Sequence, residues 1–219
     1  MKMNKRLQVI FSEIPKCSSF ADVGCDHGYI AEAVLTSGKC RSVIVSDISA
    51  PSLEKAKKLL KKYIDCGKAT AVLCDGLKLV PPCETVLIAG MGGEETIKIL
   101  SESPFLPEKL LLSPMKNQDK VRRFLEKSGY GIKKDYVFSD ERFYHIIYAE
   151  KGVFCEKYTE KEFAYGRTNL KERSADFLAY LNKELEKTLN YKSKVASEKD
   201  AAAFDEKIRE LKGIISDEN

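Results

Sequence analysis

The chain has 219 residues, of which 43% are hydrophobic, and its 37 Lys and Arg against 33 Asp and Glu give a net charge of +4. This length and composition predict one α/β domain with a small appendage and exclude a disordered protein. The low net charge excludes a massively basic nucleic-acid binder but allows a local basic patch. No stretch approaches the roughly 18 apolar residues of a membrane span, and the N-terminus lacks a signal-peptide core, so we expect a cytoplasmic protein with no membrane partner.

Seven cysteines are scattered singly along the sequence, and there are only two histidines. Zinc sites use clustered Cys and His ligands, so we predict no metal. An odd number of cysteines in a chain without a leader favours reduced thiols.

Short apolar runs alternate with amphipathic stretches over the first two thirds of the chain. The apolar runs predict buried parallel strands at 20–23, 42–45, 69–73, 85–89 and 110–112. Helices are predicted between them, at 29–36, 50–64, 94–101 and 118–127. Two later strands, 131–138 and 143–149, are predicted to be antiparallel neighbours. This pattern predicts a doubly wound, Rossmann-like α/β sheet over residues 1–152, with ligands at the carboxyl ends of its strands.

The pattern changes after residue 152, where strands give way to helical periodicity. Apolar residues step by three and four positions from 177 to 189, and a second stripe runs from 201 to 215 after a polar break near 193–200. Two such stripes predict a coiled-coil-like helical hairpin within a C-terminal extension, 153–219. Residues 151–219 carry 14 basic and 14 acidic residues, so the positive excess of the chain lies before them.

A tight turn follows the first predicted strand, with the sequence Asp22-Val23-Gly24-Cys25-Asp26-His27-Gly28. Glycines let a backbone approach a ligand closely because they have no Cβ. A dinucleotide-binding turn has glycine where this chain has Asp26, and two carboxylates would repel a pyrophosphate. The turn therefore favours a cationic cofactor such as S-adenosylmethionine over NAD, with solvated acids on an ordinary turn as the alternative.

Acidic residues also end the second and third predicted strands. Asp47, followed by Ile48, is placed to accept ribose hydroxyls, and its alternative role is to cap the next helix. Asp75-Gly76-Leu77 is placed to bind adenine, with Leu77 covering the ring, although an ordinary Asp-Gly turn is the alternative. Three acidic strand ends in succession indicate a continuous cofactor site.

The loops after the fourth and fifth predicted strands are expected to complete the pocket. Ala89-Gly90-Met91-Gly92-Gly93 brings glycine backbone against a ligand, or else is a flexible connection to the next helix. It lacks the Asn/Asp-Pro-Pro-aromatic clamp of methyltransferases that act on exocyclic amines. After Pro114, a basic cluster is placed to track phosphates, with a solvated helix face as the alternative. The cluster consists of Lys116, Lys120, Arg122 and Arg123.

Together these residues resemble the bacterial tRNA (adenine-N1)-methyltransferases that modify adenine 22. The elements that carry the resemblance are Lys5-Arg6-Leu7, residues 21–29, Asp75-Gly76-Leu77, residues 88–93, Phe143-Tyr144 and the tail from Tyr165-Gly166. They span essentially the whole chain. The resemblance implies a class I methyltransferase domain with a coiled-coil-like extension, S-adenosylmethionine as cofactor, tRNA as substrate and no metal.

The resemblance and the turn chemistry together give a set of expected contacts. The expected cofactor contacts are Asp22, Gly24, Cys25, Asp26, His27, Gly28, Asp47, Ile48, Asp75, Gly76, Leu77, Ala89, Gly90 and Met91. The expected substrate contacts are Tyr29, Gly92, Gly93, Pro114, Lys116, Arg122 and Arg123.

Asp26 and His27 are the expected catalytic residues. Adenine N1 already has a lone pair, so Asp26 is expected to stabilise charge on the ring and take the N6 proton, with His27 orienting it. Because N1 lies on the pairing edge, the base must be unpaired or flipped, and Tyr29 is a candidate stacking surface. His145, in the last predicted strand, is expected to be a packing or surface histidine.

Other functions stay open from the sequence. The chain could methylate another RNA or a small molecule, or it could bind RNA without catalysis, although three retained acids argue against an inactive site. An NAD-dependent oxidoreductase is disfavoured by Asp26. We expect a monomer whose helical tail is an RNA-side clamp, with self-association through the tail as the alternative.

Overall fold

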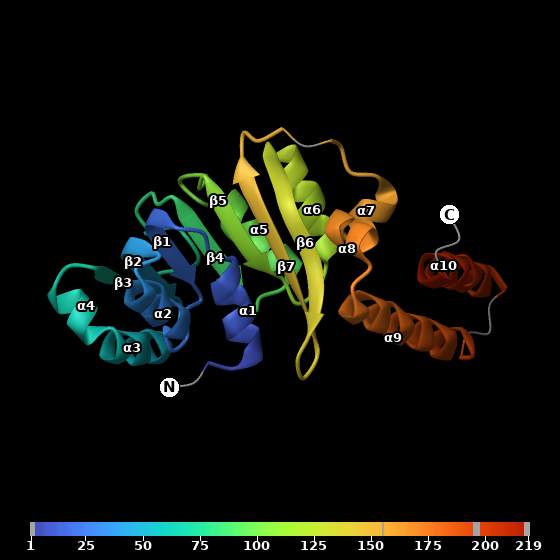
Figure 1. Cartoon of the computed structure of the whole chain (residues 1–219), viewed down its shortest axis with the longest axis horizontal. Helices are drawn as coiled ribbons and strands as arrows, with labels where there is room; N and C mark the ends of the chain where they lie inside the picture. The colour runs from blue at the N-terminus through green and yellow to red at the C-terminus, as the bar shows by residue number, and fades with distance from the viewer. Residues whose placement is uncertain (1–2, 155, 195–197, 217–219) are drawn as a thin grey trace.

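One mixed sheet organises the N-terminal two thirds of the molecule, as described by a computed structural model over residues 3–154, 156–194 and 198–216. Its strands are β1 (Cys17–Val23), β2 (Cys40–Asp47), β3 (Ala69–Leu73), β4 (Thr85–Ala89), β5 (Lys109–Ser113), β6 (Tyr130–Ser139) and β7 (Phe143–Lys151). Within the described residues the strand order is β3-β2-β1-β4-β5-β7-β6 (Figure 1). Strand β7 runs antiparallel to both of its neighbours, β5 and β6, and the other pairs of neighbouring strands are parallel in the described sheet. The order reverses between β1 and β4, the position where ligands bind in sheets of this type.

Helices cover both faces of this sheet. The helices of one face are α1 (Lys5–Glu13), α2 (Tyr29–Ser37) and α3 (Ala50–Leu59), and those of the other are α5 (Gly93–Ser101) and α6 (Gln118–Lys127). A short helix, α4 (Lys61–Asp65), follows α3. No helix within the described residues is long and apolar enough to cross a membrane.

The remaining helices follow the sheet and lie beyond its β6 edge, at the opposite end of the molecule from α3 and α4 (Figure 1). They are α7 (Glu160–Tyr165), α8 (Arg167–Glu172), α9 (Ala175–Lys192) and α10 (Glu198–Ser216). The predicted C-terminal helices are therefore present, and α9 and α10 share a small core with Val137 of β6. The domain boundary at 152/153 and the coiled-coil geometry stay predictions.

The two faces of the sheet enter separate cores because successive strand residues point in opposite directions. In β5, Leu110 and Leu112 pack on the face of α5 and α6, whereas Leu111 packs on the face of α1, α2 and α3. All three leucines are fully buried. Burial on both faces explains why the strands are continuous apolar runs in the sequence, and all seven predicted strands lie within observed ones.

The helices depart from the sequence expectations in two places. The predicted helix 50–64 is divided at Leu60, where the backbone leaves helical geometry with ψ 6°. The apolar stripe continues through this break, since Leu60 itself is fully buried, so the periodicity does not reveal it. Helices α1, α7 and α8 were not predicted. Helices α7 and α8 have only six residues each, too few for a periodic apolar pattern, whereas α1 is as long as the predicted α2 and α5 and was missed.

Cys17 and Cys40 form a disulfide, so the expectation of reduced thiols is wrong for this pair. Both residues begin adjacent parallel strands and are paired in register, which brings their Cα atoms to 4.9 Å, within disulfide range. This pairing depends on strand register and leaves no local sequence pattern. The free cysteines are Cys25, Cys66, Cys74 and Cys83, and Cys155 lies outside the described residues.

A fully buried carboxylate, Asp135 of β6, joins the sheet to the helices that follow it. Its Oδ2 accepts hydrogen bonds from Arg122 Nε at 3.1 Å, from the Tyr158 hydroxyl at 3.0 Å and from the Arg167 N–H at 3.0 Å. Its Oδ1 accepts the Thr168 N–H at 2.8 Å, and the Thr168 hydroxyl accepts the Asp135 N–H at 3.0 Å. One carboxylate therefore holds α6, β6, the approach to α7 and the start of α8 together.

The Asp135→Ala substitution should lower the free energy of unfolding by about 3–5 kcal/mol, because it leaves the Arg122 charge buried without its partner. Guanidinium chloride titration followed by circular dichroism measures this loss. The matched control is Glu54→Ala, which removes the exposed Lys57–Glu54 pair and should change stability little. Similar losses of unfolding free energy in both variants would contradict the stabilising role assigned to Asp135.

Candidate functional site

The loop between β1 and α2 is folded against the end of β2. The N–H groups of Gly24 and Cys25 donate to the Ser46 carbonyl at 2.8 and 3.1 Å, and the Gly28 N–H donates to the Cys25 carbonyl at 2.8 Å. Gly24 and Gly28 have φ of +71° and +74°, a region that favours glycine. A Cβ on Gly28 would also lie 3.1 Å from the Ala56 Cβ of α3. The predicted turn is therefore built by backbone contacts that larger residues would disturb.

Asp47 fixes this turn from the end of β2. Its Oδ2 accepts the Asp26 N–H at 3.1 Å and its Oδ1 accepts the Ser49 N–H at 2.8 Å, so both oxygens keep a further lone pair for a ligand hydroxyl. The N-cap of α3 is Ser49, whose Oγ accepts the Ser52 N–H, so the alternative role of Asp47 as helix cap is wrong.

Asp26 and His27 form a hydrogen-bonded pair at the rim of the turn. The distance from His27 Nδ1 to Asp26 Oδ2 is 2.6 Å, and their side chains are 37% and 64% exposed. An ionised carboxylate only accepts, so Nδ1 is the donor of this hydrogen bond. The His27 ring stacks on Tyr29 with centroids 5.2 Å apart. These residues present an acidic group beside an aromatic surface.

Asp22 is the buried acid of the site, only 6% exposed at the end of β1. Burial, with a smaller effect from Asp47, raises the pKa of Asp22 from 3.8 to about 7. A bound cation would favour its ionised form, whereas a pyrophosphate would be repelled by both carboxylates. Burial also raises the pKa of the Cys25 thiol, so this thiol stays protonated and is not a nucleophile. The residues present therefore fit a cofactor with ammonium and sulfonium charges, as S-adenosylmethionine has.

The glycine loop after β4 is held along the loop after β5. Three backbone hydrogen bonds, of 2.8 to 3.2 Å, join residues 90–93 to residues 113–116. A Cβ on Gly93 would lie 2.5 Å from the Asn117 carbonyl oxygen, so glycine permits this approach. The loop is thus a fixed wall of the site, and the alternative of a merely flexible connection is not supported by its bonding. The Ser113 hydroxyl beside it is buried without a hydrogen-bond partner among the described residues.

Two long side chains close the site over glycine backbone. The Met91 Cε lies 2.2 Å from the position that a Cβ on Gly24 would take. Arg6 of α1 approaches Gly90 in the same way, because its Nη2 lies 2.9 Å from the position that a Cβ on Gly90 would take. The Arg6 guanidinium lies 5.0 Å from the centre of the Tyr144 ring. The Arg6 Nε is buried and makes no hydrogen bond within the described part of the chain. Arg6 entered the sequence analysis only through the resemblance, because its approach to Gly90 is a long-range contact.

The basic cluster after Pro114 is mostly engaged in internal ion pairs. The pairs are Arg122 with Asp135, Arg123 with Glu160, and Lys120 with Glu94. Arg122 is 1% exposed, so its predicted contact with substrate phosphates is wrong. Arg123 is partly exposed and forms a bidentate pair with Glu160 of α7, and its contact with substrate phosphates stays a prediction. Lys116 remains exposed, with its Cε 3.0 Å from where a Cβ on Gly92 would lie.

The residues predicted near the adenine differ in their exposure and in their partners. Asp75 Oδ2 is bound to Lys78 Nζ at 2.6 Å, and this ion pair lowers the pKa of Asp75. The Leu77 side chain is 1% exposed in the core, so the prediction that it covers the adenine ring is wrong. Ile48, in contrast, is 74% exposed directly after Asp47 and presents apolar surface there.

His145 is buried at the far side of β7 and is the packing histidine that the sequence predicts. Its ring meets Tyr180 edge-on with centroids 5.3 Å apart, and burial lowers its pKa to about 3. It therefore stays neutral and outside the site. Over the described residues, no group of three or more His, Cys, Asp or Glu side chains is arranged to hold a metal ion.

Comparison with known proteins adds to this geometry. A family model described as a methyltransferase domain matches residues 3–147. The tRNA (adenine(22)-N(1))-methyltransferase of Bacillus subtilis is 25% identical over 228 residues, covering 96% of this chain and 93% of that protein. A Mycoplasma pneumoniae relative is 30% identical over 153 residues, covering 67% of this chain and 70% of its own. The structure of Streptococcus pneumoniae Sp1610 in complex with S-adenosyl-L-methionine matches with a TM-score of 0.87 at 25% identity, over 98% of this chain and 100% of that chain.

The raised pKa of Asp22 predicts two opposite pH effects. Folded Asp22 holds its proton more tightly than the unfolded chain, so the free energy of unfolding should fall as the pH rises from 3.8 to about 7. Affinity for S-adenosylmethionine should instead rise as the pH passes through about 7, by up to about tenfold between near pH 6 and near pH 8, because the cation selects ionised Asp22. Calorimetry at both pH values measures this, and Asp22→Asn should flatten both profiles. A pH profile equal in both proteins would rule out Asp22 as the titrating group.

Proposed function

The chain belongs to the family of proteins with a methyltransferase domain, and we propose that it transfers a methyl group from S-adenosylmethionine to N1 of an adenine in tRNA, at position 22. The observation that carries the cofactor is the pair of carboxylates, Asp22 and Asp47, at the ends of adjacent strands around a glycine turn. The substrate assignment is supported by the activity named for the Bacillus subtilis relative, which matches nearly the whole chain.

The cofactor site runs across the carboxyl ends of β1, β2 and β3. Asp22 and Asp47 would hold the cationic and ribose parts, and Ile48 and Asp75 lie further along toward the adenine end. Ala89, Gly90 and the Met91 loop border the same edge at β4. S-adenosylmethionine, when bound, supplies an electrophilic methyl group on a sulfonium.

Catalysis in this proposal depends on position and charge more than on a strong base. The lone pair of adenine N1 forms the new bond to carbon while the carbon–sulfur bond breaks, so the ring gains the positive charge that sulfur loses. The Asp26 carboxylate would stabilise that charge and accept the N6 proton afterwards, with the His27 Nδ1 bond holding it in place. Tyr29, stacked on His27, offers an aromatic face for the flipped base. Gly92 and Lys116 would border the base, with the buried Gly93 and Pro114 supporting them from behind.

The segment 153–219 is proposed as a separate helical extension that orients tRNA. Its nearly equal numbers of positive and negative residues, 13 and 14, argue against binding by charge alone, and its attachment through Asp135 supports a fixed arm. We propose a monomer in the cytoplasm, with no metal. Sedimentation at several protein concentrations separates this from self-association through α9 and α10.

Asp47→Ala should weaken S-adenosylmethionine binding by about 10- to 100-fold, because it removes charge-assisted hydrogen bonds and releases the Asp26 N–H. Isothermal titration calorimetry measures the loss. Asp65→Ala, which changes an exposed acid on α4, is the control and should bind the cofactor normally. Unaltered binding by the Asp47 variant would remove this residue from the proposed site.

Asp26→Asn should lower kcat by about 10²-fold while cofactor affinity stays within a few-fold, because the amide keeps the left-handed backbone but loses the charge. Single-turnover methylation with saturating cofactor measures this. Native turnover by this variant would show that Asp26 is not the catalytic carboxylate.

The proposed reaction is tested with labelled S-adenosylmethionine and an unmodified tRNA transcript. We expect label in 1-methyladenosine at position 22, identified by nucleoside analysis and mapped by a transcript in which that adenine is replaced. Label on an exocyclic amine, on another RNA or on protein would overturn the assignment. Binding of NAD in place of S-adenosylmethionine would overturn the cofactor.

A further inference from the structure

The positive charge of this chain is concentrated in one short segment. Residues 50–68, which include α3 and α4, carry six lysines and two acids. Their excess of four equals the net charge of +4 of the whole protein, so the rest of the sequence is balanced. The lysines are Lys55, Lys57, Lys58, Lys61, Lys62 and Lys68. We call them the α3–α4 lysine patch.

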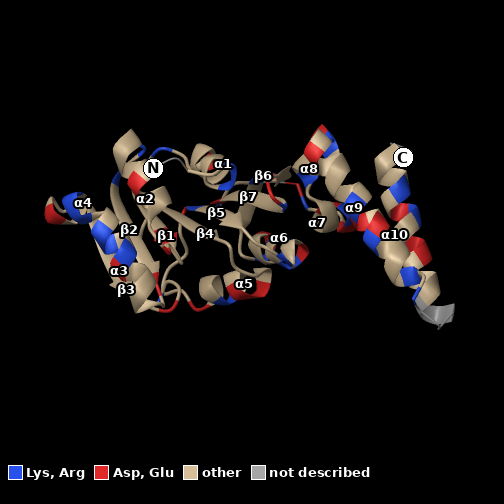
Figure 2. Cartoon of the chain, turned by 90° about the horizontal axis from the view of Figure 1, so that it is seen from below, with Lys and Arg blue, Asp and Glu red and all other residues tan. Residues whose placement is uncertain are grey.

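Most of this patch is free to bind an anion. Lys57 pairs with Glu54 at 2.7 Å, and Lys61 pairs with Asp65 at 2.9 Å. The other four, Lys55, Lys58, Lys62 and Lys68, are exposed and form no ion pair within the residues that the structure describes. Helices α3 and α4 accordingly show more blue than red in Figure 2, whereas α9 and α10 show both colours mixed. The remaining basic cluster near the site, after Pro114, is largely neutralised by partners.

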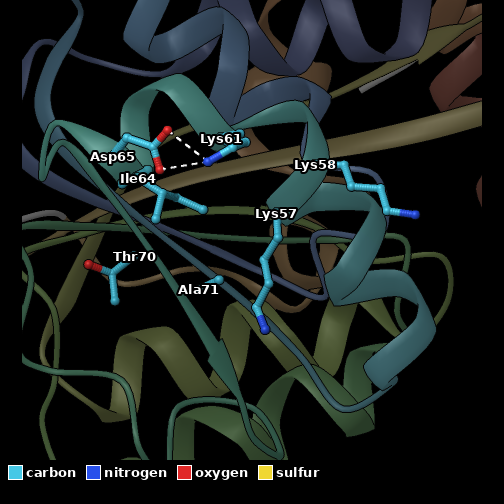
Figure 3. Close-up of a pocket in the computed structure, with 8 residues that line it drawn as sticks. Lys57, Lys58, Lys61, Ile64, Asp65, Thr70 and Ala71 are labelled. Atoms are coloured by element: carbon cyan, nitrogen blue, oxygen red, sulfur yellow. Dashed lines mark hydrogen bonds and ion pairs between the residues drawn. The ribbon is translucent and has the colours of Figure 1, made fainter.

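The patch also borders a hollow at the outer edge of the sheet. The hollow has a volume of about 540 Å³ and lies between the two helices and β3. Figure 3 shows Ile64, Thr70 and Ala71 along it, with Lys57 and Lys58 on the helix above. The ammonium groups of the lysines suit the phosphates of a nucleic acid backbone, and the apolar carbon beside them suits its sugars.

We propose that the α3–α4 lysine patch is a second RNA-binding surface that holds the tRNA backbone away from the reacting base. This proposal rests on the proposed function, since the substrate there is a long polyanion. Helix α3 starts three residues after Asp47, at the cofactor edge, and its ten residues extend about 15 Å. Two strand spacings, about 10 Å, separate β2 from β4. These distances add to about 25 Å, less than one turn of a nucleic acid duplex, so one RNA can reach the patch and the pocket together.

The test neutralises the four unpaired lysines in the full-length protein, as K55Q/K58Q/K62Q/K68Q. The Kd for a tRNA transcript should rise at least about tenfold, and the slope of log Kd against log salt should fall by about 3, because four phosphate contacts are lost. The KM for tRNA should rise in parallel, while kcat at saturating tRNA and the affinity for S-adenosylmethionine stay unchanged.

A matched control removes the same charge elsewhere. K98Q/K127Q/K133Q/K151Q changes four exposed lysines on α5, α6, β6 and β7 that form no ion pair in the described residues. It should keep native tRNA affinity and salt slope, which shows that position and not net charge matters. Equal losses of tRNA affinity in both variants, or no loss in the patch variant, would overturn the proposal. The lysines would then serve to prevent aggregation through the β3 edge or to bind an acidic protein. A wild-type protein that binds tRNA with the full salt slope but does not methylate it would contradict the proposed function and not the patch.

Discussion

A buried charge ties the start of the helical extension to the sheet. Asp135 is fully buried, and an ionised carboxylate in such a place is stable only if donors replace its hydration. Those donors come from a helix before it, Arg122 of α6, and from Tyr158, Arg167 and Thr168 after it. Hydrogen bonds have direction, whereas apolar contacts do not, so this carboxylate sets how the helical extension is oriented on β6.

The central strands were predictable because they are buried on both faces. A short apolar run such as that of β5 can be recognised as a strand from its own residues, without knowing which strands lie beside it. The same locality explains the errors. The sequence places Arg122 in a cluster of cations, and only the fold brings Asp135 to it. The disulfide between Cys17 and Cys40 likewise depends on strand register, which no single segment contains.

The candidate site follows the same division between local and long-range information. Asp22 and Asp47 were recognisable because parallel strands bring their carboxyl ends to one edge, so a charge at the end of each strand implies proximity. The Asp26 backbone bond to Asp47 refines this, since it makes the turn and the second strand one unit. Leu77 was misplaced because sequence shows that a residue follows a strand but not the side to which it turns. Arg6 carried no local signal at all, and its place beside Gly90 was found from the fold.

The docking of α1 has a consequence for the order in which the molecule is completed. Lys5 Nζ donates to the Ser139 carbonyl at 2.5 Å, and the Arg6 N–H donates to Asp140, so the first helix is tied to the last hairpin across 134 residues. The Arg6 guanidinium reaches Gly90 only from that docked position, above the ring of Tyr144. During synthesis the helix can pack early on α2 and Lys39, but it gains its contacts with the β6–β7 hairpin only after that hairpin has left the ribosome. Arg6, which borders the site beside Gly90, is therefore held in place by a hairpin made 134 residues after it.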